Sequence, residues 1–137
     1  RYEQKYATRI AGVKNHRFSL SDGLMLKDNH LKALNGIKAI TYRHKNSKKF
    51  FFEIEVEKLS EIEPALLLKP NILMFDNFSL KQIEKGIKIV NKRAKIEISG
   101  LKSEKELKKL SHLKIDFISM GDLTKNIKAI DFSLNVI

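Results

Sequence analysis

Short apolar segments alternate with longer amphipathic segments along most of the chain, and this alternation constrains the fold more than any other feature. The short segments are bounded by polar or turn residues, as buried strands are, and they span residues 24–27, 50–56, 72–75, 96–99 and 117–120. Between them, apolar residues recur at helical spacing over residues 30–42, 59–68, 80–90 and 104–113. This order predicts parallel strands with right-handed crossovers, in either an open doubly wound sheet or a barrel.

Two helix ends are marked in the sequence. Ser103 and Glu106 have the spacing of a capping box, which predicts a helix start. Pro70 is expected to end the helix that precedes the third strand. Since no low-complexity linker interrupts the 137 residues, we expect residues 1–137 to be a single domain or part of a larger one. The sequence begins without Met and enters a helical pattern at once, which is typical of a fragment.

The chain is strongly basic, with a net charge of +11 and no cysteine. A basic surface attracts anions, so either nucleic acid or small phosphate and carboxylate substrates would fit. The charge has an equally good explanation without an anionic partner. An AT-rich genome encodes many lysines, and these would lie on the solvated faces of helices. The lack of cysteine excludes disulfides and thiolate metal sites. We find neither a signal peptide nor an apolar run of the ~18 residues that a membrane span needs, and expect a cytoplasmic protein.

Polar residues follow nearly every expected strand, at the end where parallel α/β folds collect functional groups. An Asp-Asn pair after a strand is by itself more often a turn or a helix cap. Glu53, Glu55 and Glu57 alternate and so share one face of their strand, which on an edge strand would be a solvated face. Five strand ends with the same polar character nevertheless predict one site. Glu55 and Asp76 with nearby basic groups and two glycine-containing loops indicate a phosphorylated substrate with a bridging metal.

Six motifs, in order and covering essentially the whole chain, closely resemble the bacterial quinolinate phosphoribosyltransferases. They are GVKNHRFSLSDGLMLKDNH at 12–30, FEIEVE at 52–57, ILMFDNFS at 72–79, IEISG at 96–100, DFISMGDLT at 116–124 and IDFSLNV at 130–136. The resemblance implies transfer of phosphoribose from phosphoribosyl pyrophosphate to quinolinate with decarboxylation, giving nicotinate mononucleotide, pyrophosphate and CO2. It also implies Mg²⁺ and a homodimer whose active sites are shared.

The fold that the resemblance implies is a TIM-like, irregular α/β barrel of six or seven strands. The barrel would be incomplete here, because the family's N-terminal domain and first barrel strand precede Arg1. An Arg-Lys-Thr motif that supplies two basic substrate ligands would be missing with them. We therefore expect the 137-residue chain alone to be catalytically inactive.

The resemblance also assigns roles to individual residues. His16 and Arg17 would hold quinolinate, and Lys27 would stand between quinolinate and the ribose. Glu55 and Asp76 would face the ribose hydroxyls and Mg²⁺, and together with Lys27 they form the expected catalytic set. His30 is a further expected substrate-binding residue, and the expected 5′-phosphate site comprises Ser99, Gly100, Leu101, Met120, Gly121, Asp122 and Lys125.

Some positions depart from the family pattern, and two other functions stay open. Leu101 replaces a second glycine and is expected to crowd the phosphate, while Asp122 and Lys125 change the charge beside it.

One alternative function is that of a molybdenum-transport-associated paralogue with another substrate, against which the KDNH motif at 27–30 argues. The other is a basic nucleic-acid-binding module, which predicts basic residues gathered on one outer face and a steep salt dependence. We expect neither nucleic acid nor a membrane as partner.

Overall fold

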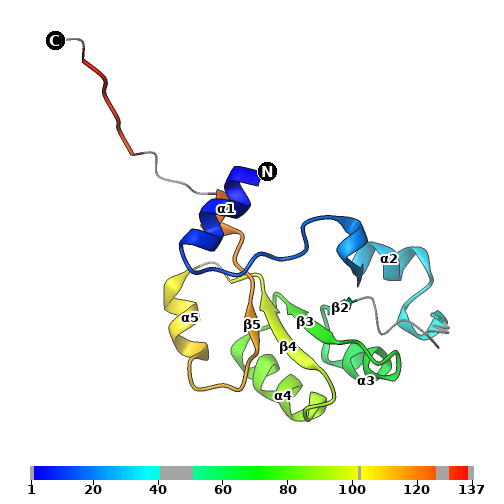
Figure 1. Ribbon diagram of the computed structural model, residues 1–137. Helices are drawn as coiled ribbons and strands as arrows, with labels where there is room; N and C mark the ends of the chain where they lie inside the picture. The colour runs from blue at the N-terminus through cyan, green and yellow to red at the C-terminus, as the bar shows by residue number, and fades with distance from the viewer. Residues whose placement is uncertain (1, 41–50, 102, 126–129, 136–137) are drawn as a thin grey trace.

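The computed structural model describes residues 2–40, 51–101, 103–125 and 130–135, and its centre is one five-stranded sheet (Figure 1). All neighbouring strands are parallel, and their order in space is their order in the sequence. The strands are β1 (Gly23–Leu26), β2 (Phe51–Val56), β3 (Ile72–Asp76), β4 (Lys95–Ser99) and β5 (Phe117–Ile118).

The sequential strand order decides between the two architectures that the alternation left open. A doubly wound sheet reverses its strand order at a switch point, whereas a barrel adds each new strand on the same side of the last one. The order β1-β2-β3-β4-β5 is of the barrel kind. Among the described residues β1 and β5 remain the edges of the sheet, so the sheet is an open arc, as expected for an incomplete barrel.

One face of the sheet carries the apolar core, and the other combines apolar side chains with buried glutamates. Helices α3 (Leu59–Leu67) and α4 (Leu80–Val90) lie beneath the sheet in Figure 1, and α5 (Glu104–Leu110) follows β4. Their apolar residues pack on one set of strand positions, which includes Ile54, Leu73, Phe75 and Ile98. The alternate positions face the other side, which we call the concave face. The pairings Met25 with Glu53, and Met74 with Glu97, place two glutamates on the concave face.

Most of the expected helix ends and strands are confirmed within one or two residues, but three elements are shorter, and one of them is the helix expected over residues 104–113, which ends at Leu110. The helix expected over residues 30–42 ends early: α2 covers Asp28–Ala33, and a 3-10 turn follows at Ile37–Ala39. Asn35 and Gly36 stand between them with φ of 57° and 94°, values that a helix cannot accommodate. Residues 41–42 lie outside the described residues. The strand expected over 117–120 contains only two residues.

Local signals at the helix ends are confirmed. The Ser103 side chain accepts a hydrogen bond from the Glu106 backbone N–H, as an N-cap does. Helix α3 ends before Pro70, where Lys69 adopts a left-handed φ of 54°. The first helix, α1 (Tyr2–Ile10), buries none of its residues, and residues 130–135 are exposed throughout. Among the helices that the structure describes, none combines the length and apolar character needed to cross a membrane.

Candidate functional site

A cleft of about 1080 Å³ opens where the strands of the concave face end. It lies between these strand ends, α1 and the segment that leads into β1. Seven of the residues expected to form the site line it, namely His16, Arg17, Lys27, Glu55, Ser99, Met120 and Gly121. The fold therefore brings together residues that are more than 100 positions apart in the sequence.

Lys27 and Glu55 form an ion pair across the ends of β1 and β2. Lys27 Nζ lies 3.8 Å from Glu55 Oε2, and the Glu55 side chain is only 11% exposed. Burial raises the pKa of Glu55, and Lys27 opposes that rise, while the charges of Asp76, Asp28 and Glu57 add to it. Glu55 is thus a carboxylate in surroundings already rich in negative charge, and it would gain from a nearby cation.

Asp76 ends β3 beside Glu55, although it does not line the cleft itself. Its carboxylate accepts a hydrogen bond from the side-chain amide of Asn77, with Nδ2 and Oδ2 2.7 Å apart. Asn77 has a left-handed backbone with φ of 55°, and its N–H donates to the carbonyl of Ser99 on the neighbouring strand. Asn77 therefore links the acid at the end of β3 to the loop after β4.

The loop after β4 turns at a glycine with a left-handed backbone, and its side chains lie apart from the main cleft. Gly100 has φ of 81°, and with Leu101 it borders a separate hollow beside Asn77 rather than the main cleft. Leu101 packs against the hydrophobic core instead of projecting into the cleft. The expectation that Leu101 crowds a phosphate therefore stays a prediction, and it concerns the hollow beside Asn77 that Leu101 lines.

The loop after β5 contributes Met120 and Gly121 to the cleft. The side chain of Lys125 lies over Gly121, with Nζ 3.7 Å from the point where a Cβ on residue 121 would stand. Lys125 therefore brings a positive charge close to the glycine, as the sequence predicted for a phosphate site. The Asp122 side chain lies outside what the structure describes. His30 lies away from the cleft, where its Nδ1 accepts the Lys27 backbone N–H and caps α2.

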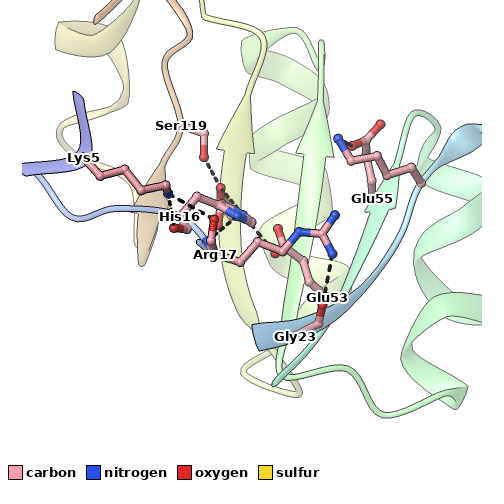
Figure 2. A network of polar contacts seen from close by, with 9 residues as sticks. Lys5, His16, Arg17, Gly23, Glu53, Glu55 and Ser119 are labelled. Atoms are coloured by element: carbon pink, nitrogen blue, oxygen red, sulfur yellow. Dashed lines mark hydrogen bonds and ion pairs between the residues drawn. The ribbon is translucent and has the colours of Figure 1, made fainter. Parts of the chain in front are cut away.

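Residues 13–17 form an extended arm that lies over the concave face and carries His16 and Arg17 (Figure 2). Lys5 of α1 fixes the arm from outside, since its Nζ donates to the carbonyls of His16 at 2.9 Å and of Arg17 at 3.1 Å. From inside, the His16 ring meets Glu53, with Nε2 and Oε2 3.2 Å apart. The Arg17 guanidinium donates through Nη1 to the carbonyl of Gly23, 3.0 Å away.

Sequence reasoning did not include Lys5, Glu53 and Glu97 in the site. Glu53 and Glu97 are 1% and 4% exposed, yet both are charged residues on the concave face. Glu97 Oε1 accepts a hydrogen bond from the Ser119 hydroxyl and lies 3.9 Å from His16 Nε2. A signal for both existed, because each stands two positions before an expected site residue, Glu55 or Ser99, and so shares its face. Nothing in the sequence points to Lys5.

Together, a barrel-type parallel sheet and a cleft with an acid, basic groups and a glycine loop at its strand ends define the chain as an α/β-barrel domain. The family model described as "Quinolinate phosphoribosyl transferase, C-terminal domain" matches residues 1–135. The chain belongs to this family. It resembles a probable nicotinate-nucleotide pyrophosphorylase (carboxylating) of Methanocaldococcus jannaschii, 38% identical over 98% of this chain and 50% of the relative. A relative of the same description from Bacillus subtilis is 31% identical, over 97% of this chain and 47% of its own length.

Solved structures agree with the sequence comparisons. NadC from Streptococcus pyogenes superposes with a TM-score of 0.84 at 41% identity, over 97% of this chain and 47% of that one. The nicotinate-nucleotide pyrophosphorylase of Francisella tularensis gives a TM-score of 0.83 at 38% identity, over 94% and 46%. The predicted family and fold class are thereby confirmed. The chain spans about half the length of the relatives it matches.

Proposed function

We propose that this chain provides the catalytic C-terminal half of a quinolinate phosphoribosyltransferase. In the proposed reaction the pyridine nitrogen of quinolinate bonds to the anomeric carbon of phosphoribosyl pyrophosphate as pyrophosphate leaves. The 2-carboxylate then departs as CO2 and a proton takes its place, giving nicotinate mononucleotide. The observation that carries the proposal is the Lys27–Glu55 pair at the mouth of the cleft, in a chain that belongs to this family.

The basic groups on one side of the cleft fit a dicarboxylate. Arg17 and Lys27 both line the cleft, and His16 lies beside Arg17 on the arm. The guanidinium of Arg17 can hold a carboxylate through two parallel hydrogen bonds, while Lys27 acts as a compact point charge. Because Lys27 also pairs with Glu55, it stands where the quinolinate and ribose sites would meet.

Glu55 and Asp76 fit a divalent cation that accompanies the pyrophosphate. They are oxygen ligands at adjacent strand ends, and the charge of Asp76 adds to the rise that burial causes in the pKa of Glu55. Bound Mg²⁺ would neutralise pyrophosphate oxygens as the glycosidic bond breaks. The two carboxylates would themselves stabilise positive charge that develops at the anomeric carbon.

The loops after β4 and β5 fit the 5′-phosphate. Ser99 and Gly121 line the cleft, and Lys125 lies over Gly121. Backbone N–H groups of a glycine turn and a lysine ammonium are both effective phosphate ligands. Leu101 packs against the hydrophobic core and does not line the cleft.

Two further properties are part of the proposal. The active protein would be a cytoplasmic homodimer in which the partner contributes basic ligands to each site. The 137-residue chain by itself would form no nicotinate mononucleotide, because about half of the length of its relatives has no counterpart in it.

The test is an assay of the complete protein that contains this chain, with quinolinate, phosphoribosyl pyrophosphate and Mg²⁺. Release of CO2 in step with nicotinate mononucleotide, lost when Mg²⁺ is removed, would support the proposal. No turnover of quinolinate by a folded, dimeric protein would contradict it and favour a paralogue with another substrate. Binding to DNA or RNA that falls steeply with salt would instead favour the nucleic-acid alternative.

A further inference from the structure

Glu53 is a buried charge with no role in the proposed chemistry. Its side chain is 1% exposed in the middle of β2, between the apolar side chains of neighbouring strands, to which it is paired at Met25 and Ile72. Its Oε1 has no hydrogen-bond partner among the described residues. A carboxylate in such a position costs free energy of folding, and an apolar residue would pack there without that cost. Stability of the fold therefore does not explain why a glutamate stands there.

The contact that Glu53 does make is with the arm. Its Oε2 lies 3.2 Å from His16 Nε2, and Figure 2 shows the carboxylate below the ring. The other ring nitrogen, Nδ1, accepts the backbone N–H of Arg17 at 2.9 Å. Since Nδ1 is an acceptor, the ring hydrogen is on Nε2 and is donated to Glu53. The Arg17 N–H thus sets the tautomer of the ring, and the carboxylate, as the acceptor of the Nε2 hydrogen, fixes the orientation of the ring.

This chain of contacts ends at the residue expected to bind the substrate. Glu53 holds the ring, the ring holds the Arg17 backbone, and the Arg17 guanidinium is held at the carbonyl of Gly23, on the strand next to Glu53. On the outer side of the arm, Lys5 donates hydrogen bonds to the backbone carbonyls of His16 and Arg17. A guanidinium can make its paired hydrogen bonds to a carboxylate only from a well-defined position.

We propose that Glu53 is a positioning residue for quinolinate, which acts through the His16 ring to set the place of Arg17 in the cleft. The inference rests on the proposed function and adds to it a residue that touches no substrate. A metal ion bound by His16, Glu53 and Glu97 is the competing explanation, because their ligand atoms lie within 4.8 Å of one another. The hydrogen that Nε2 donates to Glu53 leaves that nitrogen no lone pair for a metal. The geometry therefore favours the role of Glu53 in holding the His16 ring over a metal site.

The experiment uses Glu53→Leu and Glu53→Gln in the complete protein. Glu53→Leu removes the acceptor and should raise the KM for quinolinate about 10- to 100-fold, with the KM for phosphoribosyl pyrophosphate nearly unchanged. Glu53→Gln keeps an oxygen that can accept the Nε2 hydrogen and should restore most of the affinity. Glu63→Leu is the matched control, since Glu63 pairs with Arg93 on the outer surface, with N and O 2.6 Å apart, and should leave both KM values unchanged.

A double-mutant cycle with Arg17→Ala separates positioning from a general effect on folding. If Glu53 acts through Arg17, adding Glu53→Leu to Arg17→Ala should change the quinolinate KM by less than about 2-fold. Multiplicative effects of the two substitutions, an equal rise of both KM values, or a stoichiometric metal ion lost on Glu53→Leu would each overturn the inference.

The Nε2 hydrogen of His16 gives a readout that does not depend on turnover. Nitrogen NMR of the wild-type protein should show a hydrogen on Nε2, and Glu53→Leu should shift the Nε2–H resonance because its acceptor is lost. An unchanged Nε2–H resonance in Glu53→Leu would overturn the inference that Glu53 holds the ring, even if the enzyme is active. Absence of quinolinate turnover by the wild type, together with the expected shift at Nε2, would instead count against the proposed function and still support the contact of Glu53 with the ring.

Discussion

Gly100 stands against the side-chain amide of Asn77 so closely that no Cβ atom fits at position 100. A Cβ would overlap Oδ1 of Asn77 and lie 2.9 Å from its Cγ. Asn77 in turn donates to the carboxylate of Asp76. The turn expected to cradle a phosphate is therefore in direct contact with the residue that orients an acid of the site.

Gly100→Ala should damage both stability and the phosphate site. The left-handed φ of 81° and the overlap with Asn77 act together, and we expect a loss of about 2–3 kcal/mol in the free energy of unfolding. Gly12→Ala is the matched control, because φ there is 80° but no atom lies within 4 Å of the added Cβ. It should cost only about 1 kcal/mol. Urea unfolding measures both, and equal losses would show that the Asn77 contact has no influence.

Lys27→Ala should abolish most of the activity of the complete protein. Loss of the charge that we propose faces both substrates should reduce kcat/KM about 100- to 1000-fold. Lys27 also opposes the rise in the pKa of Glu55, so its removal raises that pKa further. The acidic limb of the rate profile should therefore move to higher pH. Lys85→Ala, on the exposed side of α4, is the control and should leave kcat/KM and the pH profile unchanged.

The burial of Glu97 predicts that the free energy of unfolding depends on pH. Burial raises the pKa of Glu97 above its usual 4.5, and the charge of Glu53 adds to the rise against the opposing Ser119 hydrogen bond. Between the ordinary and the raised pKa the folded state binds more protons than the unfolded state, so stability falls as pH rises through that window. Glu97→Gln keeps the Ser119 contact without the charge and should stabilise the protein at pH 7 by about 1 kcal/mol.

The advantage of Glu97→Gln should shrink as pH falls towards 4.5, where wild-type Glu97 is itself protonated. Thermal unfolding from pH 4.5 to pH 8 tests this. A stabilisation that is the same at every pH would show that Glu97 does not titrate in this range.

Gly86→Ala tests the packing of α4 on the sheet. Alanine is the better helix former, but its Cβ would lie 2.6 Å from Cε2 of Phe75 and 3.3 Å from Cδ1 of Ile62. We expect the overpacked core to lose about 1–3 kcal/mol in the free energy of unfolding. Lys85→Ala on the same helix should change it by less than about 0.5 kcal/mol. Stabilisation by Gly86→Ala would mean that the helix can shift away from β3 at little cost.

The sequence by itself determined the number and order of the strands and the presence of a helix between each strand and the next, because each depends on a local period of two or 3.6 residues. It also predicted Lys27, Glu55 and Asp76 as site residues, because strand ends in a parallel sheet share one edge and the surrounding motifs resemble those of a family. It could not choose between a doubly wound sheet and a barrel, since both give the same local pattern. It extended α2 too far, because the apolar spacing continues past the turn at Asn35 and Gly36.

Tertiary structure alone decided which side chains meet. The contact of His16 with Glu53, the approach of Gly100 to Asn77 and the burial of Leu101 all join residues from different strands or loops. Such contacts depend on strand register and on the path of the arm across the sheet, and no local period encodes them. The chemical groups of the site could therefore be read from the sequence, whereas the buried acid that we propose positions them became visible only in the fold.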